Sequence, residues 1–150
     1  MAGAWLLGPE TRDTADEPPR AVLVAVVRDD RMDEGAPGTQ TSLRELERLA
    51  DTDGLTVADT VVQSRDRPDP ATYVGSGKVR ELAVAVERCG ADVVIVDGEL
   101  SPGQARNLHD KVGVPVVDRT ALILDIFAEH ARTSEGRLQV ELAQIAYQLP

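Results

Sequence analysis

Residues 21–27 form an unbroken apolar run, Ala-Val-Leu-Val-Ala-Val-Val, with no polar side chain to face water. A run of this kind predicts a strand that is buried on both faces, as in parallel sheets with helices on each side. Residues 92–96 are a further predicted strand, in which Asp92 is followed by four apolar residues, and residues 114–117 are another apolar run. Residues 55–63 are rich in β-branched side chains. The sequence therefore predicts a mostly parallel sheet of about four strands.

Segments with helical periodicity lie between these predicted strands. Leu43, Leu46 and Leu49 fall on one face of a helix that Thr41 or Ser42 is predicted to cap. A second helix follows Gly77 and ends at Gly90, since glycine commonly ends helices.

Two more helices carry clear start signals. Ser101, Pro102 and Gln104 stand at the N-cap, N1 and N3 positions of a capping box. Asp118 is the predicted N-cap of a helix that begins near Arg119. Alternating strands and helices predict an α/β fold, a small doubly wound sheet flanked by helices.

Length and composition fit one compact domain. The 150 residues are 42% hydrophobic, and Cys89 is the lone cysteine, so a disulfide framework is excluded and a cytoplasmic location is expected. The first 20 residues lack the features of a signal peptide, and no apolar run is long enough to span a membrane.

The net charge of -10 argues against general attraction to nucleic acid. Proteins that neutralise many phosphates usually carry a basic surface. Any contact with RNA must therefore come from a local cluster of cations.

The C-terminal segment carries an apolar seam at Leu138, Leu142, Ile145 and Leu149, spaced +4, +3, +4 as in a coiled coil. Gly136 is expected to break or kink the helix line just before this seam. Such a seam needs a partner, either the body of the chain or another copy.

We therefore divide the chain into a disordered tail (1–20), an α/β domain (21–132) and the start of a helical, coiled-coil subdomain (133–150). We expect this last part to be truncated.

Three segments carry a resemblance to a known family. They read Tyr-Val-Gly-Ser-Gly-Lys over 73–78, Glu-Leu-Ser-Pro-Gly-Gln-Ala-Arg-Asn-Leu over 99–108, and the run over 118–149 that contains Leu-Asp-Ile-Phe-Ala and Tyr-Gln-Leu-Pro. In this order and spacing, the chain resembles the N-terminal domain of the HflX-type GTPases over roughly residues 21–150.

The resemblance implies a role on the ribosome. Such a domain is expected to dock on the large ribosomal subunit and its rRNA, while a GTPase domain drives splitting or rescue of ribosomes under stress. GTP and Mg²⁺ are expected for that GTPase domain, and no cofactor or metal is expected for the present chain. Self-association through residues 138–149 is a further expectation.

Gly75-Ser76-Gly77-Lys78 is not a P-loop. That motif needs glycine where Thr72 stands and a hydroxyl residue where Val79 stands. Gly75, Gly77 and Lys78 at a helix start are still able to present N–H groups and a cation to a phosphate of RNA or of a nucleotide.

Further candidate phosphate contacts are Arg106, Asn107 and Arg119, which lie near the predicted ligand edge of the sheet. Other cations considered for the same role are Arg65, Arg67, Arg132 and Arg137. We expect no catalytic residue within the chain.

Two alternatives come from other functional classes. One is a stand-alone α/β domain that binds ATP. The other is a phospho-accepting receiver domain, with acids after the first strand (Asp29, Asp30) and the third (Asp97). The receiver is disfavoured because the chain enters a long helix where a receiver has a fifth strand.

Overall fold

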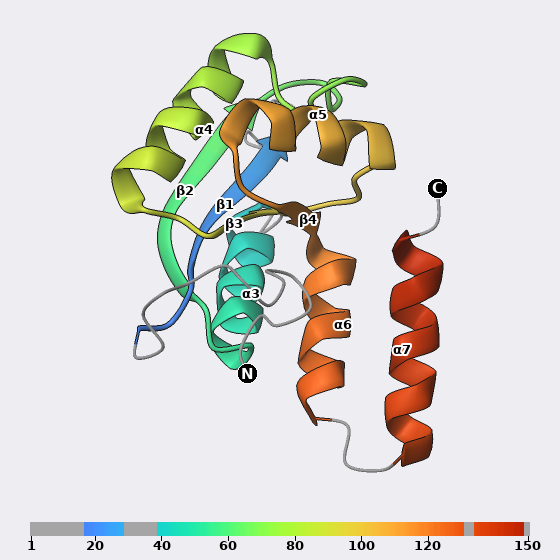
Figure 1. The fold of residues 1–150 in the computed structure, drawn as a ribbon. Coiled ribbons are helices and arrows are strands. Elements are labelled where there is room, and N and C mark those ends of the chain that lie inside the picture. Colours follow the sequence, from blue (N-terminus) through green and yellow to red (C-terminus); the bar gives the residue numbers. More distant parts are fainter. Residues whose placement is uncertain (1–16, 29–38, 131–133, 149–150) are drawn as a thin grey trace.

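A computed structural model describes residues 17–28, 39–130 and 134–148. In these residues, four strands form one parallel sheet in the order β2-β1-β3-β4 (Figure 1). The strands are β1 (Arg20–Val27), β2 (Thr56–Ser64), β3 (Val93–Val96) and β4 (Val116–Asp118). The predicted sheet is confirmed. Of the predicted tail, residues 1–16 lie outside the described part, and Arg20 already belongs to β1.

Helices cover both faces of the sheet, as predicted (Figure 1). They are α3 (Thr39–Thr52), α4 (Ser76–Cys89), α5 (Pro102–Val112), α6 (Arg119–His130) and α7 (Ser134–Gln148). The helices α3 and α6 pack on one face, and α4 and α5 pack on the other.

The apolar run of β1 supplies both layers of the core. Ala21 and Leu23 pack with α3 and α6, whereas Val22 and Val24 pack with α4 and α5. All four side chains are fully buried. Each buried valine or leucine contributes roughly 1.5–3 kcal/mol, so this strand anchors the sheet between its two helical layers.

The predicted helix starts are confirmed at α5 and α6. Ser101 Oγ accepts a hydrogen bond from the Gln104 amide (3.1 Å), and Gln104 Oε1 accepts one from the Ser101 amide (2.9 Å). Asp118 Oδ1 accepts from the Ala121 amide (3.1 Å), as an N-cap does. Both starts lie at the carboxyl edge of the sheet.

The predicted cap of α3 is wrong, because this helix begins at Thr39 and contains Thr41 and Ser42. The Ser42 hydroxyl and carbonyl instead accept hydrogen bonds from Arg119 (3.2 and 2.8 Å). A tertiary contact therefore replaces the local cap, which the sequence pattern alone does not reveal.

The helix α7 runs back alongside α6 and packs on it (Figure 1). Tyr147 Oη donates to Asp118 Oδ1 over 2.8 Å, and Tyr147 packs against the α3–α6 layer of the core. Burial is the main cause that raises the pKa of Tyr147 well above its usual value, followed by the bond to Asp118. The hydrogen bond of Tyr147 therefore helps to orient α7, with the face that carries Tyr147 packed against the rest of the domain.

The apolar seam lies on the other side of α7. Leu138, Leu142 and Ile145 are 56%, 58% and 54% exposed, so the body of the chain does not cover them. Leu149 lies outside the described residues. Gly136 does not separate the two helices, because α7 already begins at Ser134.

Among the described helices, none is both long and apolar enough to cross a membrane.

Candidate nucleic-acid interface

The carboxyl edge of the sheet is where several loops and helix starts meet. The segment after β2, residues 65–75, passes over this edge toward α5 (Figure 1). We call it the 65–75 loop. Asp97 and Gly98 follow β3, and the first turns of α4, α5 and α6 begin at the same edge. This is the edge at which open α/β sheets bind ligands.

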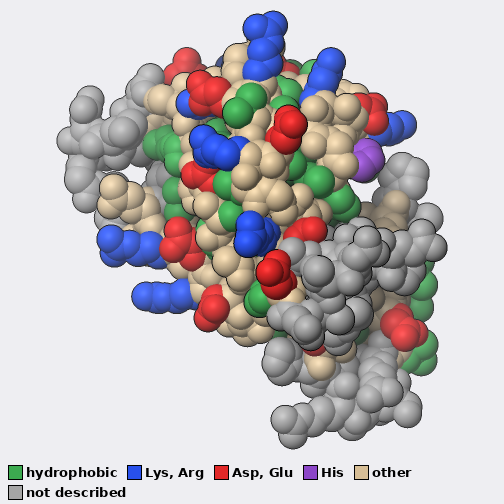
Figure 2. All heavy atoms as spheres, turned by 60° about the vertical axis from the view of Figure 1, so that its left-hand side comes forward, with side chains coloured by type: hydrophobic (Ala, Val, Ile, Leu, Met, Phe, Trp, Pro, Cys, Tyr) green, Lys and Arg blue, Asp and Glu red, His purple; other side chains and the backbone are tan. Residues whose placement is uncertain are grey.

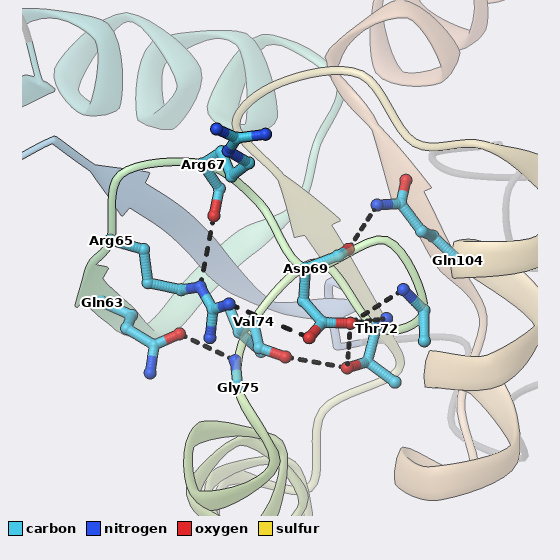
Figure 3. Close-up of polar contacts among 9 residues, drawn as sticks. Gln63, Arg65, Arg67, Asp69, Thr72, Val74, Gly75 and Gln104 are labelled. Atoms are coloured by element: carbon cyan, nitrogen blue, oxygen red, sulfur yellow. Dashed lines mark hydrogen bonds and ion pairs between the residues drawn. The ribbon is translucent and has the colours of Figure 1, made fainter.

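Asp69 organises the 65–75 loop from inside. Its Oδ1 accepts hydrogen bonds from the backbone amides of Ala71 (2.8 Å) and Thr72 (3.1 Å), as drawn in Figure 3. The first of these bonds is the main cause that lowers the pKa of the Asp69 carboxyl. Backbone bonds of 2.9 Å run in both directions between Asp69 and Tyr73. The carboxylate therefore stays ionised and closes the loop on itself.

Side chains from α5 and β2 hold the loop from outside. Gln104 Nε2 donates to the Asp69 carbonyl (2.7 Å), and Asn107 Nδ2 donates to the Ala71 carbonyl (2.9 Å). On the other side, Gln63 Oε1 accepts from the Gly75 amide (2.8 Å) (Figure 3). The loop is thus fixed to two elements of the scaffold.

Tyr73 holds a strained backbone within this loop. Its φ is +65°, in the left-handed region that non-glycine residues rarely adopt. Its ring is buried, its hydroxyl lies 3.4 Å from the Asp97 carbonyl, and burial raises its pKa. Strain of this kind costs about 1–3 kcal/mol and persists only where the surroundings enforce it.

Gly75, Gly77 and Lys78, which were predicted to hold a phosphate together, differ in how available they are to a ligand. The Gly75 amide is already bonded to Gln63, so it is not available to a phosphate. Gly77 is exposed in the first turn of α4, and a Cβ added there would meet nothing within 4 Å. Lys78 Nζ pairs with Glu81 Oε2 at 2.8 Å. Of these three residues, Gly77 is open to a ligand, whereas Lys78 must give up its ion pair with Glu81 to bind a phosphate.

Arg106 and Asn107 are neighbours on α5 with different surroundings. Asn107 binds the 65–75 loop, as described above. Arg106 is exposed, and within the described residues it makes no hydrogen bond or ion pair. Arg106 is therefore the predicted contact that is most available to a partner.

Arg119 is held in place by the body of the chain. Its guanidinium lies 3.0 Å from Asp97 Oδ1 and 3.4 Å from Glu45 Oε2, besides its bonds to Ser42. Arg119 and Asp97 therefore form an ion pair. This pairing leaves the Asp97 side chain 8% exposed, which is unlike an acid that must be open to a phosphoryl donor.

Several residues named from the sequence are not placed. Asp29, Asp30 and Arg132 lie outside the described residues, and so does the side chain of Arg137.

Positive charge is not concentrated on the face shown in Figure 2. Lys and Arg side chains stand among Asp and Glu side chains there, and no patch of one sign forms. This fits the net charge of -10, and on this face it restricts a contact with an anion to single cations.

Sequence reasoning missed the residues that shape the loop, namely Asp69, Tyr73 and Gln63. A signal for Asp69 was present, since it stands between Pro68 and Pro70, and aspartate favours turns in which it bonds backbone two residues on. No comparable signal marks Tyr73, because its conformation depends on residues far away in the sequence.

A family model and two curated relatives identify the same family of proteins. Residues 40–128 match the family described as "GTP-binding GTPase N-terminal". The chain is 46% identical over 138 residues to GTPase HflX of Caldanaerobacter subterraneus, and 50% identical over 105 residues to GTPase HflX of Escherichia coli. These alignments cover 92% and 70% of the chain but 31% and 25% of the relatives. The chain therefore spans a quarter to a third of these curated relatives.

Solved structures share the fold. A crystal structure titled as the complex of SsGBP and GDP superimposes with a TM-score of 0.66 at 23% identity, over 88% of this chain and 36% of that one. A GTP-binding protein from Sulfolobus solfataricus in complex with GDP gives a TM-score of 0.62 at 23% identity, over 88% of this chain and 37% of that one. At this identity the likeness supports the fold alone.

Proposed function

Because the chain belongs to the GTP-binding GTPase N-terminal family, the N-terminal domain of the HflX-type GTPases, we propose that it is a docking domain for the large ribosomal subunit. In the whole protein, GTP and Mg²⁺ serve a separate GTPase domain, which splits or rescues ribosomes under stress in the cytoplasm. The residues described here supply recognition and no GTP chemistry.

The observation that carries this proposal is the set of unpaired cations beside a rigid loop at the carboxyl edge. The side chains of Arg106 and of Arg67, which lies in the 65–75 loop, are both exposed. Neither has a hydrogen-bond or ion-pair partner within the described residues. A free guanidinium binds a phosphate with charge-assisted hydrogen bonds. An ion-paired cation such as Arg119 must first give up its acids, so it contributes less.

Co-sedimentation with purified large and small ribosomal subunits over a salt series tests the proposal. We expect pelleting with the large subunit that weakens as salt rises, because phosphate contacts release counterions. A chain that pellets with neither subunit at low salt, or equally with both, contradicts the docking role.

A second candidate is binding of ATP phosphates at the start of α4. The open space above Gly77 and the proximity of Lys78 favour it. A thermal-shift titration with ATP, repeated with Lys78→Ala, tests this function separately. A rise in melting temperature that Lys78→Ala abolishes supports ATP binding, and an unchanged melting temperature excludes it.

A further inference from the structure

We infer that the 65–75 loop is a preshaped recognition loop that presents the Arg67 guanidinium to an RNA phosphate, with Asp69 as its positioning residue. This inference rests on the proposed function and adds to it the element and the residue that make the contact.

The loop is built to hold one shape. Asp69, Gln63, Gln104 and Asn107 together bind its backbone at five points. Tyr73 keeps a left-handed backbone under these restraints. A fixed loop loses little conformational entropy when it binds, which favours its use in recognition.

The backbone of the loop leaves little room for an anion. The amides of Asp69, Ala71, Thr72 and Tyr73 already donate within the loop, and the Val74 amide donates to the Thr72 carbonyl (2.6 Å). The Gly75 amide donates to Gln63. Between Asp69 and Gly75, a phosphate must therefore be recognised by side chains rather than by backbone N–H groups. The amides of Asp66 and Arg67 make no hydrogen bond within the described residues, so they are able to support a contact made by the Arg67 side chain.

Arg67 is the side chain that meets this requirement. Arg65 lies inside the network, since its Nε donates to the Arg67 carbonyl (3.2 Å) and its Nη2 lies 3.9 Å from Asp69 Oδ2. The side chain of Arg67 points away from these bonds in Figure 3 and is exposed. Its bonded carbonyl fixes the backbone position from which the free guanidinium projects.

Two substitutions at Asp69 distinguish the effect of the loop's shape on RNA binding from the effect of its negative charge. Removing an acid from an RNA-binding surface should strengthen binding if only charge matters. Asp69→Asn keeps an oxygen able to accept from Ala71 and Thr72, whereas Asp69→Ala removes that acceptor. A preshaped loop predicts that Asp69→Ala binds large subunits about threefold to tenfold more weakly, while Asp69→Asn binds at least as tightly as the parent.

Hydrogen exchange of Ala71 and Thr72 provides the structural readout, which should quicken in Asp69→Ala and not in Asp69→Asn. If both variants bind at least as tightly as the parent, shape is irrelevant and the positioning role is refuted.

Arg67→Ala tests the contact itself. We expect weaker binding and a slope of log K against log salt that is smaller in magnitude by about 1. The matched control is Arg48→Ala on α3, which also removes an exposed arginine that has no partner in the described part of the chain. This control should bind like the parent. If the parent binds and Arg67→Ala binds equally well, the inference fails and the docking proposal survives. If the parent itself does not bind, both fail.

Discussion

Tyr73 excludes any side chain at position 98. A Cβ added to Gly98 would lie 2.3 Å from the Tyr73 hydroxyl oxygen and 3.3 Å from Cζ of the same ring. The strand end after β3 and the 65–75 loop after β2 therefore meet through an aromatic ring packed against a glycine. This contact ties the strained loop to the sheet.

Gly98→Ala should lower the free energy of unfolding by about 1–3 kcal/mol, because the buried ring has to move. Adding Tyr73→Phe to it removes the closest atom and should recover part of the loss. Gly77→Ala is the control, since its Cβ meets open space. Denaturant unfolding measures all three, and equal stability of Gly98→Ala and the parent would contradict the packing described.

Asp53 should make stability depend on pH. Burial is the largest cause that raises its pKa to about 9, followed by its hydrogen bond with Asp125 and the charges of Asp125 and Glu129. Both of its oxygens are buried and lack a donor within the described residues, so a proton on Asp53 supplies the bond to Asp125. The folded state thus holds a proton that the unfolded chain releases near its ordinary pKa of 3.8.

The free energy of unfolding contributed by this group is therefore fully present below about pH 4 and is lost as pH rises toward 9. Asp53→Asn, which needs no proton, should flatten this decline and be at least about 1 kcal/mol more stable than the parent at pH 9. Parallel pH profiles for the two proteins would show that Asp53 is ionised when folded. Carboxylate oxygens of Asp53, Asp125 and Glu129 lie within 4.8 Å of one another, so the profiles should be repeated with EDTA to exclude a bound cation.

The helix α7 should exchange its amide protons faster than β1, because it packs on α6 with one face and exposes the apolar stripe of the other to solvent. Tyr147 Oη bonds it to Asp118. Tyr147→Phe removes that bond and should speed exchange over residues 138–148 further while leaving β1 unchanged. Exchange in α7 as slow as in β1, in a chain of monomeric mass, would show that this helix is part of the stable core.

The exposed stripe of Leu138, Leu142 and Ile145 predicts self-association at high concentration. Leu142→Glu should abolish it, whereas Gln139→Glu adds the same charge off the stripe and should not. Sedimentation equilibrium measures the mass, and a parent chain that stays monomeric at its solubility limit contradicts this role for the stripe.

GTP hydrolysis should be absent from this chain. Thr72 stands where a P-loop has its first glycine, and its hydroxyl donates to the Val74 carbonyl (2.8 Å). Val79 stands where a P-loop has its Mg²⁺-binding hydroxyl, and it is a buried apolar residue. A phosphate-release assay should show no GTP turnover above buffer. Turnover that disappears in Lys78→Ala would contradict this prediction.

The sheet and its helices were predictable because their signals are local. The apolar run of β1, the capping box of Ser101 and the cap of Asp118 each depend on a few consecutive residues. The site was only partly predictable. Arg106 was expected near the carboxyl edge of the sheet and lies there on α5, whereas the partners of Arg119 are far away in the sequence.

Contacts between distant residues explain what the sequence did not reveal. The shape of the 65–75 loop depends on Gln104 and Asn107, more than thirty residues away from the carbonyls that they bind. The exposed face of α7 depends on Tyr147 and Asp118. Side-chain pairs of this kind leave no periodic pattern.

The most direct test of RNA docking through the carboxyl edge is photo-crosslinking to large ribosomal subunits from two positions. A photoreactive phenylalanine analogue replaces the exposed Asp66, next to Arg67 in the 65–75 loop, or the exposed Lys111 in the last turn of α5. Docking through the carboxyl edge predicts crosslinks to rRNA from position 66 and none from position 111. No crosslink from position 66, under conditions in which the chain pellets with the large subunit, would contradict it.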